Sequence, residues 1–334
     1  MAIIDKIKAK AMSDVKHIVL PEGDEPRTVA AAVQIQAQGL AKLTLLGNPD
    51  KVKAVAAGAD LTGIDIIDPA DSDKAPLYAA TLYDLRKAKG MTEEEAAKKV
   101  ADPMYYGIMM VKLGDADGLV SGAIHSTGDM LRPALQVIKS KPGMKTVSSC
   151  FLMECPDKSF GDNGVMIFSD CGVNIDPDAE QLANIALGAA DSARSLAGME
   201  PRVAMLSYST DGSAEGPLVD KVREAVRIAN EQRPDLAIDG EFQLDSAIVP
   251  AVAAKKVRRE SAVAGKANVL VCPDINVGNI GVKLVQNFAH ADAYGPFLQG
   301  FKKIVCDCSR SAPVSELVGN VVMSCVRSQA LKEA

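Results

Sequence analysis

The side chains that could do chemistry gather in short polar turns, each of which follows an apolar run. Two of these turns, SGAIHST (121–127) and CDCSRS (306–311), carry hydroxyl groups, a histidine and an arginine. The others are LPEG (20–23), FSDCGVN (168–174), SYSTDGSA (207–214) and PDINVGNIG (273–281). In open α/β sheets, ligands bind at the carboxyl ends of strands, and free backbone N–H groups at a following helix start bind phosphate. The turns therefore indicate an enzyme scaffold suited to anionic ligands.

The residue types exclude several other kinds of site. The chain has neither a G-x-x-x-x-G-K-[ST] loop nor a G-x-G-x-x-G motif after an apolar run, which argues against a P-loop and a standard dinucleotide fold. Its three histidines are His17, His125 and His290, too few for a catalytic scheme built on several of them. No Cys/His pairs have zinc spacing, so we expect no metal. Seven cysteines in a chain of this length indicate reduced thiols rather than a disulfide framework.

The elements that must position these turns alternate along the chain. Apolar runs rich in β-branched residues predict strands at 17–23, 42–48, 63–68, 118–123, 146–154, 164–170, 202–210, 268–274 and 303–309. Helical spacing is clearest at 25–39, 76–89, 92–113, 178–198, 217–230, 245–256, 279–291 and 315–331. This alternation predicts an α/β fold, in which helices cover a parallel or mixed sheet.

The length of 334 residues suggests two domains. The polar segment 139–146 contains Pro-Gly and is a plausible linker, and a second crossing is expected near 293–300. We therefore expect one α/β domain to comprise 1–145 with 298–334, which carries the Ser309-Arg310 turn, and a second to comprise 146–297.

The composition argues against nucleic acid as a partner and against a membrane span. The net charge of −6 and the scattered basic residues argue against nucleic acid. The longest uncharged run is the fourteen residues from Thr28 to Ala41, well short of the ~20 apolar residues of a membrane span. Charges at Asp5, Lys6 and Lys8 interrupt any apolar core of a secretory signal, so we expect a cytoplasmic protein.

Ten segments, in order, resemble the phosphate acetyltransferase (phosphotransacetylase) family over nearly the whole chain. They are 20–23, 82–92, 117–136, 168–174, 207–214, 239–245, 263–270, 278–281, 295–300 and 308–310. The resemblance implies reversible acetyl transfer between the thiol of CoA and inorganic phosphate, by direct attack in a ternary complex. It also implies two α/β domains with the active site in the cleft between them, a fold related to isocitrate and isopropylmalate dehydrogenases, and usually a homodimer. CoA, acetyl phosphate and phosphate are then substrates, and no cofactor is expected.

The family places its catalytic Ser-Arg pair at Ser309 and Arg310. By this resemblance, Arg310 binds phosphate and neutralises charge in the transition state, while Ser309 bonds the substrate or the CoA sulfur. Glu316 stands where relatives have Asp, as the base for the CoA thiol. The purely structural alternatives are a helix N-cap serine, a surface arginine and a solvated first-turn glutamate.

The resemblance also supplies substrate-binding residues. Arg86 and Arg132 would bind substrate phosphates, including those of CoA. Apart from the resemblance, His125, Ser126 and Thr127 share one turn and could supply donors to phosphate. Arg86 on a charged helix face and His125 in a turn have structural alternatives as a surface charge and a buried structural histidine.

Cys171 follows a predicted strand and is expected to line the substrate site. The alternatives are a nucleophile that carries the acetyl group and a plain core residue. Asp211 and Glu215 stand at or near positions where many relatives have lysine. Either their loop faces away from CoA, or CoA binds through other contacts.

Other activities stay open beside acetyl transfer. A phosphate butyryl- or propanoyltransferase differs only in its acyl pocket. A non-catalytic acetyl-CoA-sensing domain shares the fold, as does an NAD-dependent decarboxylating dehydrogenase.

Overall fold

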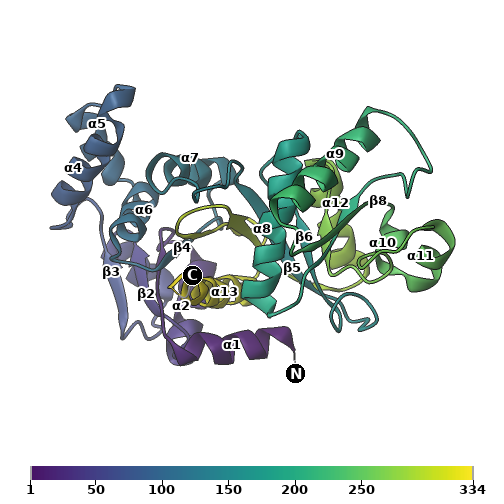
Figure 1. Ribbon diagram of the computed structural model, residues 1–334. Coiled ribbons are helices and arrows are strands. Elements are labelled where there is room, and N and C mark those ends of the chain that lie inside the picture. Colours follow the sequence, from purple (N-terminus) through teal and green to yellow (C-terminus); the bar gives the residue numbers. More distant parts are fainter. Residues whose placement is uncertain (1, 333–334) are drawn as a thin grey trace. The chain divides into compact units, whose positions relative to one another are not determined.

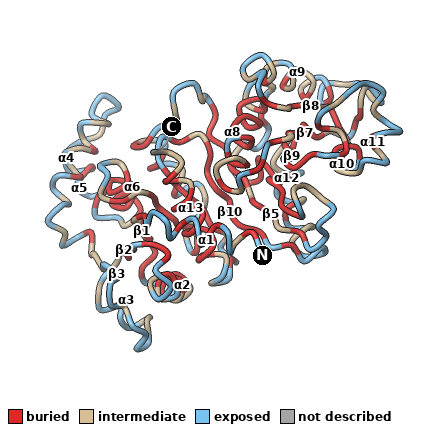
Figure 2. The backbone as a smooth tube through the Cα atoms, turned by 60° about the horizontal axis from the view of Figure 1, so that its bottom comes forward, coloured by how far each residue is buried: buried red, intermediate tan, exposed pale blue. Residues whose placement is uncertain are grey.

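The computed structural model describes residues 2–332, and contacts within the chain divide it into two compact units. Unit 1 comprises Met1–Ser140 and Phe301–Ala334, and unit 2 comprises Lys141–Gly300. Each unit has its own set of strands and its own buried core (Figures 1 and 2). The last helix of the chain therefore packs with the first 140 residues.

The strands of unit 1 are parallel and lie in the order β3-β2-β1-β4-β11. Their bounds are His17–Leu20 (β1), Lys42–Leu46 (β2), Ile64–Ile67 (β3), Gly118–Val120 (β4) and Ile304–Cys306 (β11). Because the strands are parallel, β1, β4 and β11 end side by side at one edge of the sheet. The polar turns that follow these three strands must therefore meet.

The helices of unit 1 are α1 (Ile3–Ser13), α2 (Pro26–Ala37), α3 (Pro49–Ala56), α4 (Ala75–Arg86), α5 (Glu93–Val100), α6 (Pro103–Leu113), α7 (Thr127–Val137) and α13 (Val314–Lys332). The C-terminal helix α13 packs on α1, α2 and β4. Its side chains between Leu317 and Val326 are all buried, which fits its red trace in Figure 2. A helix apolar on most faces is typical of a central position in a core.

The strands of unit 2 form a mixed sheet in the order β10-β5-β6-β9-β7-β8. They are β5 (Ser148–Glu154), β6 (Val165–Ser169), β7 (Arg202–Leu206), β8 (Ala237–Phe242), β9 (Val269–Val271) and β10 (Asp292–Gln299). Strand β5 runs antiparallel to β6 and β10, and the other pairs are parallel. The helices are α8 (Ala179–Ala197), α9 (Pro217–Gln232), α10 (Leu244–Ile248), α11 (Pro250–Lys256) and α12 (Ile275–Phe288). The predicted α/β class is thus confirmed.

The structure corrects several sequence-based boundaries. The predicted helix 92–113 is two helices, because Pro103 begins α6, and Pro250 likewise divides 245–256 into α10 and α11. Strands β8 and β10 and helices α1, α3 and α7 were not predicted. None of the described helices is long and apolar enough to cross a membrane.

Candidate functional site

A buried glutamate organises the turns at the end of β1 and β4. The Glu22 side chain is 2% exposed, and its carboxylate accepts hydrogen bonds from the backbone N–H groups of residues 122–125 at 2.9–3.2 Å. The Nδ1 atom of His125 lies 2.8 Å from the same carboxylate. Burial alone would raise the pKa of Glu22, but the bonds from His125 and from the backbone lower it to about 2. Glu22 is therefore an anion at neutral pH, and it holds the loop in place.

This arrangement changes one expectation drawn from the sequence. The N–H groups of the 122–125 turn do not face an open anion site, since Glu22 already accepts from them. His125 is bonded to Glu22 through Nδ1, and this bond raises the pKa of its ring. His125 thus has both a structural partner and a half-buried ring at the surface of a groove.

The two hydroxyl groups that follow His125 also have partners within the protein. Ser126 is the N-cap of α7 and forms a capping box with Asp129. Thr127 donates its hydroxyl to the Oδ2 atom of Asp307. Both residues therefore order the loop, whatever contact they make with a substrate.

Asp307, directly after β11, joins the second and third turns. Its side chain is 1% exposed, and its Oδ1 atom accepts from the Cys308 N–H at 3.0 Å. Gly122 makes this approach possible: a Cβ atom there would lie 2.4 Å from Asp307 Oδ1, and its φ of +118° disfavours other residues. Burial raises the pKa of Asp307 to about 6.

Sequence reasoning quoted Glu22 and Asp307 in their turns but gave neither a role. The available signal was an acidic residue directly after a buried strand in two separate turns. Their partners lie in a distant loop, the N–H groups of residues 122–125 for Glu22 and the Thr127 hydroxyl for Asp307, so spacing along the chain does not indicate them.

Ser309 and Arg310 lie in the turn after β11, as the sequence predicted. The Ser309 hydroxyl lies 2.9 Å from that of Ser311, and the Ser309 carbonyl accepts from the Ala312 N–H at 2.8 Å. Helix α13 begins at Val314, so Ser309 is not its N-cap. The Arg310 side chain is exposed, and Glu316 lies half-buried in the first turn of α13.

A groove of about 610 Å³ lies on unit 1 beside this loop cluster. Arg132, on α7, lines it together with His125, and Lys98 and Lys99 line it from α5. Acidic side chains also line it, among them Asp102 and Asp129. The groove is thus lined by charged side chains of both signs.

Arg86 is the last residue of α4 and is not among the residues that line this groove. Its Nε atom is buried and has no hydrogen-bond partner within the described residues. An unpartnered buried donor costs about 1–3 kcal/mol and therefore calls for an explanation.

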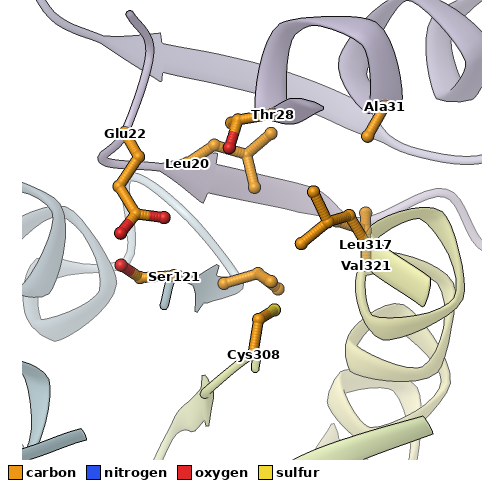
Figure 3. A pocket seen from close by; sticks show the side chains of 9 residues that line it. Leu20, Glu22, Thr28, Ala31, Ser121, Cys308, Leu317 and Val321 are labelled. Atoms are coloured by element: carbon orange, nitrogen blue, oxygen red, sulfur yellow. The ribbon is translucent and has the colours of Figure 1, made fainter. Parts of the chain in front are cut away.

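A second, much smaller cavity of about 10 Å³ lies under the turns (Figure 3). In Figure 3 the Ser121 hydroxyl faces the Glu22 carboxylate, with Cys308 below and Leu317 and Val321 beside them from α13. The Ser121 Oγ atom is buried and lacks a partner among the described residues. Such a space has room for about one water molecule and none for a substrate.

Cys171 belongs to the core of unit 2. Its side chain is buried and lies in one apolar cluster with Cys272 and Phe168. A hydrogen bond with the Cys272 thiol and burial raise the pKa of the Cys171 thiol. A thiol of this kind is a poor nucleophile, because the thiolate is the reactive form.

The loop 207–216 in unit 2 is tied down by ion pairs. Asp211 accepts from Arg259 Nε at 2.8 Å and from the Arg258 N–H at 3.0 Å. Glu241, which is 3% exposed, accepts from Arg223 Nε at 2.9 Å and from the Gly212 N–H at 3.0 Å. The charge of Asp211 is therefore compensated inside the protein. Glu215 is exposed.

Within residues 2–332, no group of three or more His, Cys, Asp or Glu side chains is placed to hold a metal ion.

The sequence and the structure of the chain are similar to those of known proteins. Residues 2–325 match the model of the phosphate acetyl/butaryl transferase family. The chain is 53% identical over 329 residues to a phosphate acetyltransferase from Thermoanaerobacterium thermosaccharolyticum, which covers 98% of this chain and 100% of that protein. It is 49% identical over 332 residues to one from Acetivibrio thermocellus, which covers 99% and 100%.

A solved structure agrees with these sequences. The crystal structure of a phosphotransacetylase from Streptococcus pyogenes superposes with a TM-score of 0.92 at 41% identity, over 99% of this chain and 100% of that one. The chain belongs to the phosphate acetyl/butaryl transferase family.

Proposed function

We propose that this protein is a phosphate acetyltransferase that interconverts acetyl-CoA and phosphate with CoA and acetyl phosphate. One observation carries the proposal: about half of its residues are identical to those of two phosphate acetyltransferases along their whole length. The turn after β11 supports it, because this turn presents Ser309 and an exposed Arg310 ahead of Glu316.

The reaction needs a base, a cationic group and hydrogen-bond donors. In the direction of acetyl-CoA synthesis, the CoA sulfur attacks the acetyl carbonyl carbon, a C–S bond forms, and the C–O bond to phosphate breaks. Glu316 takes the thiol proton, which then leaves to solvent or phosphate. Arg310 binds the departing phosphate by charge-assisted bonds, and Ser309 donates to the acyl group or the sulfur. The burial of Cys171 favours this direct transfer over an acetyl-cysteine intermediate.

The groove on unit 1 is proposed to bind the phosphates of CoA. Arg132, Lys98 and Lys99 line it, and each supplies a donor for a phosphate oxygen. Arg86 does not line the groove, so its proposed role in binding a substrate phosphate rests on the family resemblance of segment 82–92.

We extend the proposal to a homodimer. Helix α12 exposes four apolar side chains at helical spacing: Val277 is 44%, Ile280 56%, Leu284 48% and Phe288 81% exposed. An apolar stripe of this kind is typical of a protein–protein contact. Sedimentation velocity should give a dimer for the native protein and a monomer for Phe288→Asp. A native protein that sediments as a monomer contradicts this extension.

The activity is tested with purified protein, CoA and a series of acyl phosphates, by the thioester absorbance, after complete chelation of divalent metals. We expect acetyl phosphate to give the highest kcat/KM. A maximum with butyryl or propanoyl phosphate would assign the other branch of the family. Binding of acetyl-CoA without turnover would instead assign a sensing domain, and recovery of lost activity by one added metal would contradict a metal-free mechanism.

A further inference from the structure

The Arg27 side chain connects three segments that are far apart in the sequence. Its Nε atom donates to Glu25 Oε1 at 2.7 Å. Its Nη1 atom donates to the backbone carbonyls of Arg310 at 2.8 Å and Ala312 at 3.0 Å, and its Nη2 atom donates to the carbonyl of Ala123 at 2.9 Å. One guanidinium therefore joins the start of α2, the loop after β4 and the turn after β11.

These four bonds use four of the five N–H donors of a guanidinium. The side chain is thus committed to the protein, which leaves little capacity for a substrate. Whatever Arg27 does for a reaction, it does through the three carbonyls that it binds.

Helix stability does not explain an arginine at this position. Arg27 is the second residue of α2, where the positive end of the helix dipole disfavours a cation. Glu25 compensates for this: it is buried, its Oε2 atom caps α2 by accepting from the Thr28 N–H at 2.8 Å, and its other oxygen binds Arg27. The ion pair fixes the plane of the guanidinium relative to the helix.

We propose that Arg27 is a positioning residue for Arg310. It holds the Arg310 and Ala312 carbonyls against the loop that Glu22 fastens, and so sets the direction in which the Arg310 side chain leaves the backbone. This inference rests on the proposed function, in which Arg310 binds the phosphate. A displacement of a binding group by about 1 Å can reduce a rate about 100-fold.

The first test is Arg27→Lys, since lysine keeps the charge but loses the planar fork. Arg202→Lys is the matched control. Arg202 has a side chain 27% exposed against 31% for Arg27. Like Arg27 it binds one carboxylate, that of Asp162, and it binds the backbone carbonyl of Lys266. It lies at the amino end of β7 in unit 2.

We expect kcat of Arg27→Lys to fall about 10- to 100-fold with acetyl phosphate and CoA, with KM for CoA nearly unchanged. Arg202→Lys should stay within about twofold of the native kcat. A native kcat in folded Arg27→Lys would overturn the inference.

A double-mutant cycle separates positioning from a general effect on the fold. In an Arg310→Ala background there is no guanidinium left to position. Adding Arg27→Lys to Arg310→Ala should therefore lower kcat by less than about threefold. If the losses of the two changes multiply, Arg27 does not act through Arg310. If Arg27→Lys does not fold, Glu25→Gln provides the same test. The glutamine amide oxygen can still cap α2, but the negative charge that orients Arg27 is gone. We expect kcat of Glu25→Gln to be about tenfold lower than that of the native protein.

Titration calorimetry with inorganic phosphate measures the affinity that Arg310 is proposed to provide, without the need for turnover. Phosphate should bind the native protein and Arg202→Lys equally, and Arg27→Lys about tenfold more weakly. A native protein that lacks turnover but shows this difference refutes the proposed function and leaves the positioning role standing. If the native protein turns over and Arg27→Lys has the native phosphate affinity and the native kcat, the proposed function stands and the positioning role is refuted.

Discussion

Each unit fastens a loop at the carboxyl end of its sheet with one buried glutamate, but the two surroundings differ. Glu22 in unit 1 accepts from four backbone N–H groups and His125. Glu241 in unit 2 accepts from Arg223, Ser209 and Gly212. Burial raises the pKa of each carboxyl, yet the hydrogen bonds lower both to about 2. Both glutamates are therefore anions that hold a loop.

The two units differ in how well their other polar side chains are paired. In unit 2, Arg259 pairs with Asp211 and Asp239. In the described part of unit 1, the buried Arg86 Nε and Ser121 Oγ atoms have no partner, and Asp307 has a pKa raised to about 6. Folding alone favours satisfied polar groups, and perturbed ones cluster at functional sites. The unpartnered polar atoms of unit 1 support the proposal that its loops bind the substrates.

The largest expected effect tests whether Glu316 takes the thiol proton. Glu316→Gln should lower kcat about 100- to 10,000-fold with CoA affinity nearly intact. The deficit should shrink as the pH approaches the thiol pKa near ~8.5, because solvent then supplies thiolate, whereas Arg310→Ala should stay impaired at every pH. The stopped assay is the acetyl-CoA thioester absorbance between pH 6 and 9.

The control for this change is a first-turn glutamate of unit 2. Glu180→Gln removes the same kind of helix-dipole contact in α8 and should leave kcat unchanged. Near-normal turnover of Glu316→Gln at neutral pH would remove the base role and leave thiolate formation to Arg310 alone.

The next largest effect is expected for Glu22→Gln, which should lower the free energy of unfolding. The pKa of Glu22 falls from 4.5 to about 2 on folding, so its ionised form contributes about 3–4 kcal/mol above pH ~4.5. This contribution is lost as the pH falls toward 2. Urea unfolding at pH 7 and at pH 3 should therefore show a smaller deficit at the lower pH.

Glu241→Gln sharpens the comparison. It should also destabilise the protein but leave KM for CoA unchanged if the 207–216 loop faces away from the substrate. A raised KM would show that this loop contacts CoA despite its acidic residues.

Asp307→Asn should act in the opposite direction. Its folded pKa lies above the ordinary 3.8, at about 6, so the stability that its protonated form contributes is present below pH ~3.8 and lost as the pH rises through 6. At pH 7 the ionised carboxyl costs about 3 kcal/mol. The amide should therefore stabilise the protein by up to that amount at pH 7 and not at pH 3.5, in urea titrations. A less stable Asp307→Asn at both pH values would contradict this account.

The smallest effect concerns the arginines proposed to bind phosphate. Arg132→Ala and Arg86→Ala should each raise KM for CoA or acetyl phosphate by roughly 10- to 150-fold, or about 1.5–3 kcal/mol, with little change in the unfolding midpoint. Arg227, which pairs with Glu224 and Glu231 on the surface of α9, provides the control. Unchanged kinetics in either variant would return that arginine to the role of a surface charge.

Periodicity and turn residues were enough to predict most of the fold. The nine predicted strands overlap β1–β7, β9 and β11. Strand β8 was missed because AIDGEF alternates acidic residues and glycine with apolar ones, and β10 because it contains Gly295-Pro296, which indicates a turn. Helices α1 and α3 were missed because they are short and largely polar on one side.

The site was predictable only in part, because its residues act in two ways. Ser309 and Arg310 were proposed from the family resemblance, and they lie in the turn after β11 as expected. Arg27 and Asp307 bind groups of remote loops: Arg27 donates to the Arg310 carbonyl 283 residues away, and Asp307 accepts from the Thr127 hydroxyl 180 residues away. Spacing in one sequence contains no signal for such pairs, since the strand order alone brings them together.

The seven buried cysteines give the protein its own reporters of opening. Cys306, Cys308 and Cys325 lie in unit 1, and Cys150, Cys155, Cys171 and Cys272 lie in unit 2. An alkylating reagent reaches these sulfurs only when the surrounding structure opens. Timed alkylation followed by peptide mass spectrometry would thus measure how often each half of the chain opens, with no engineered label and no change to the sequence.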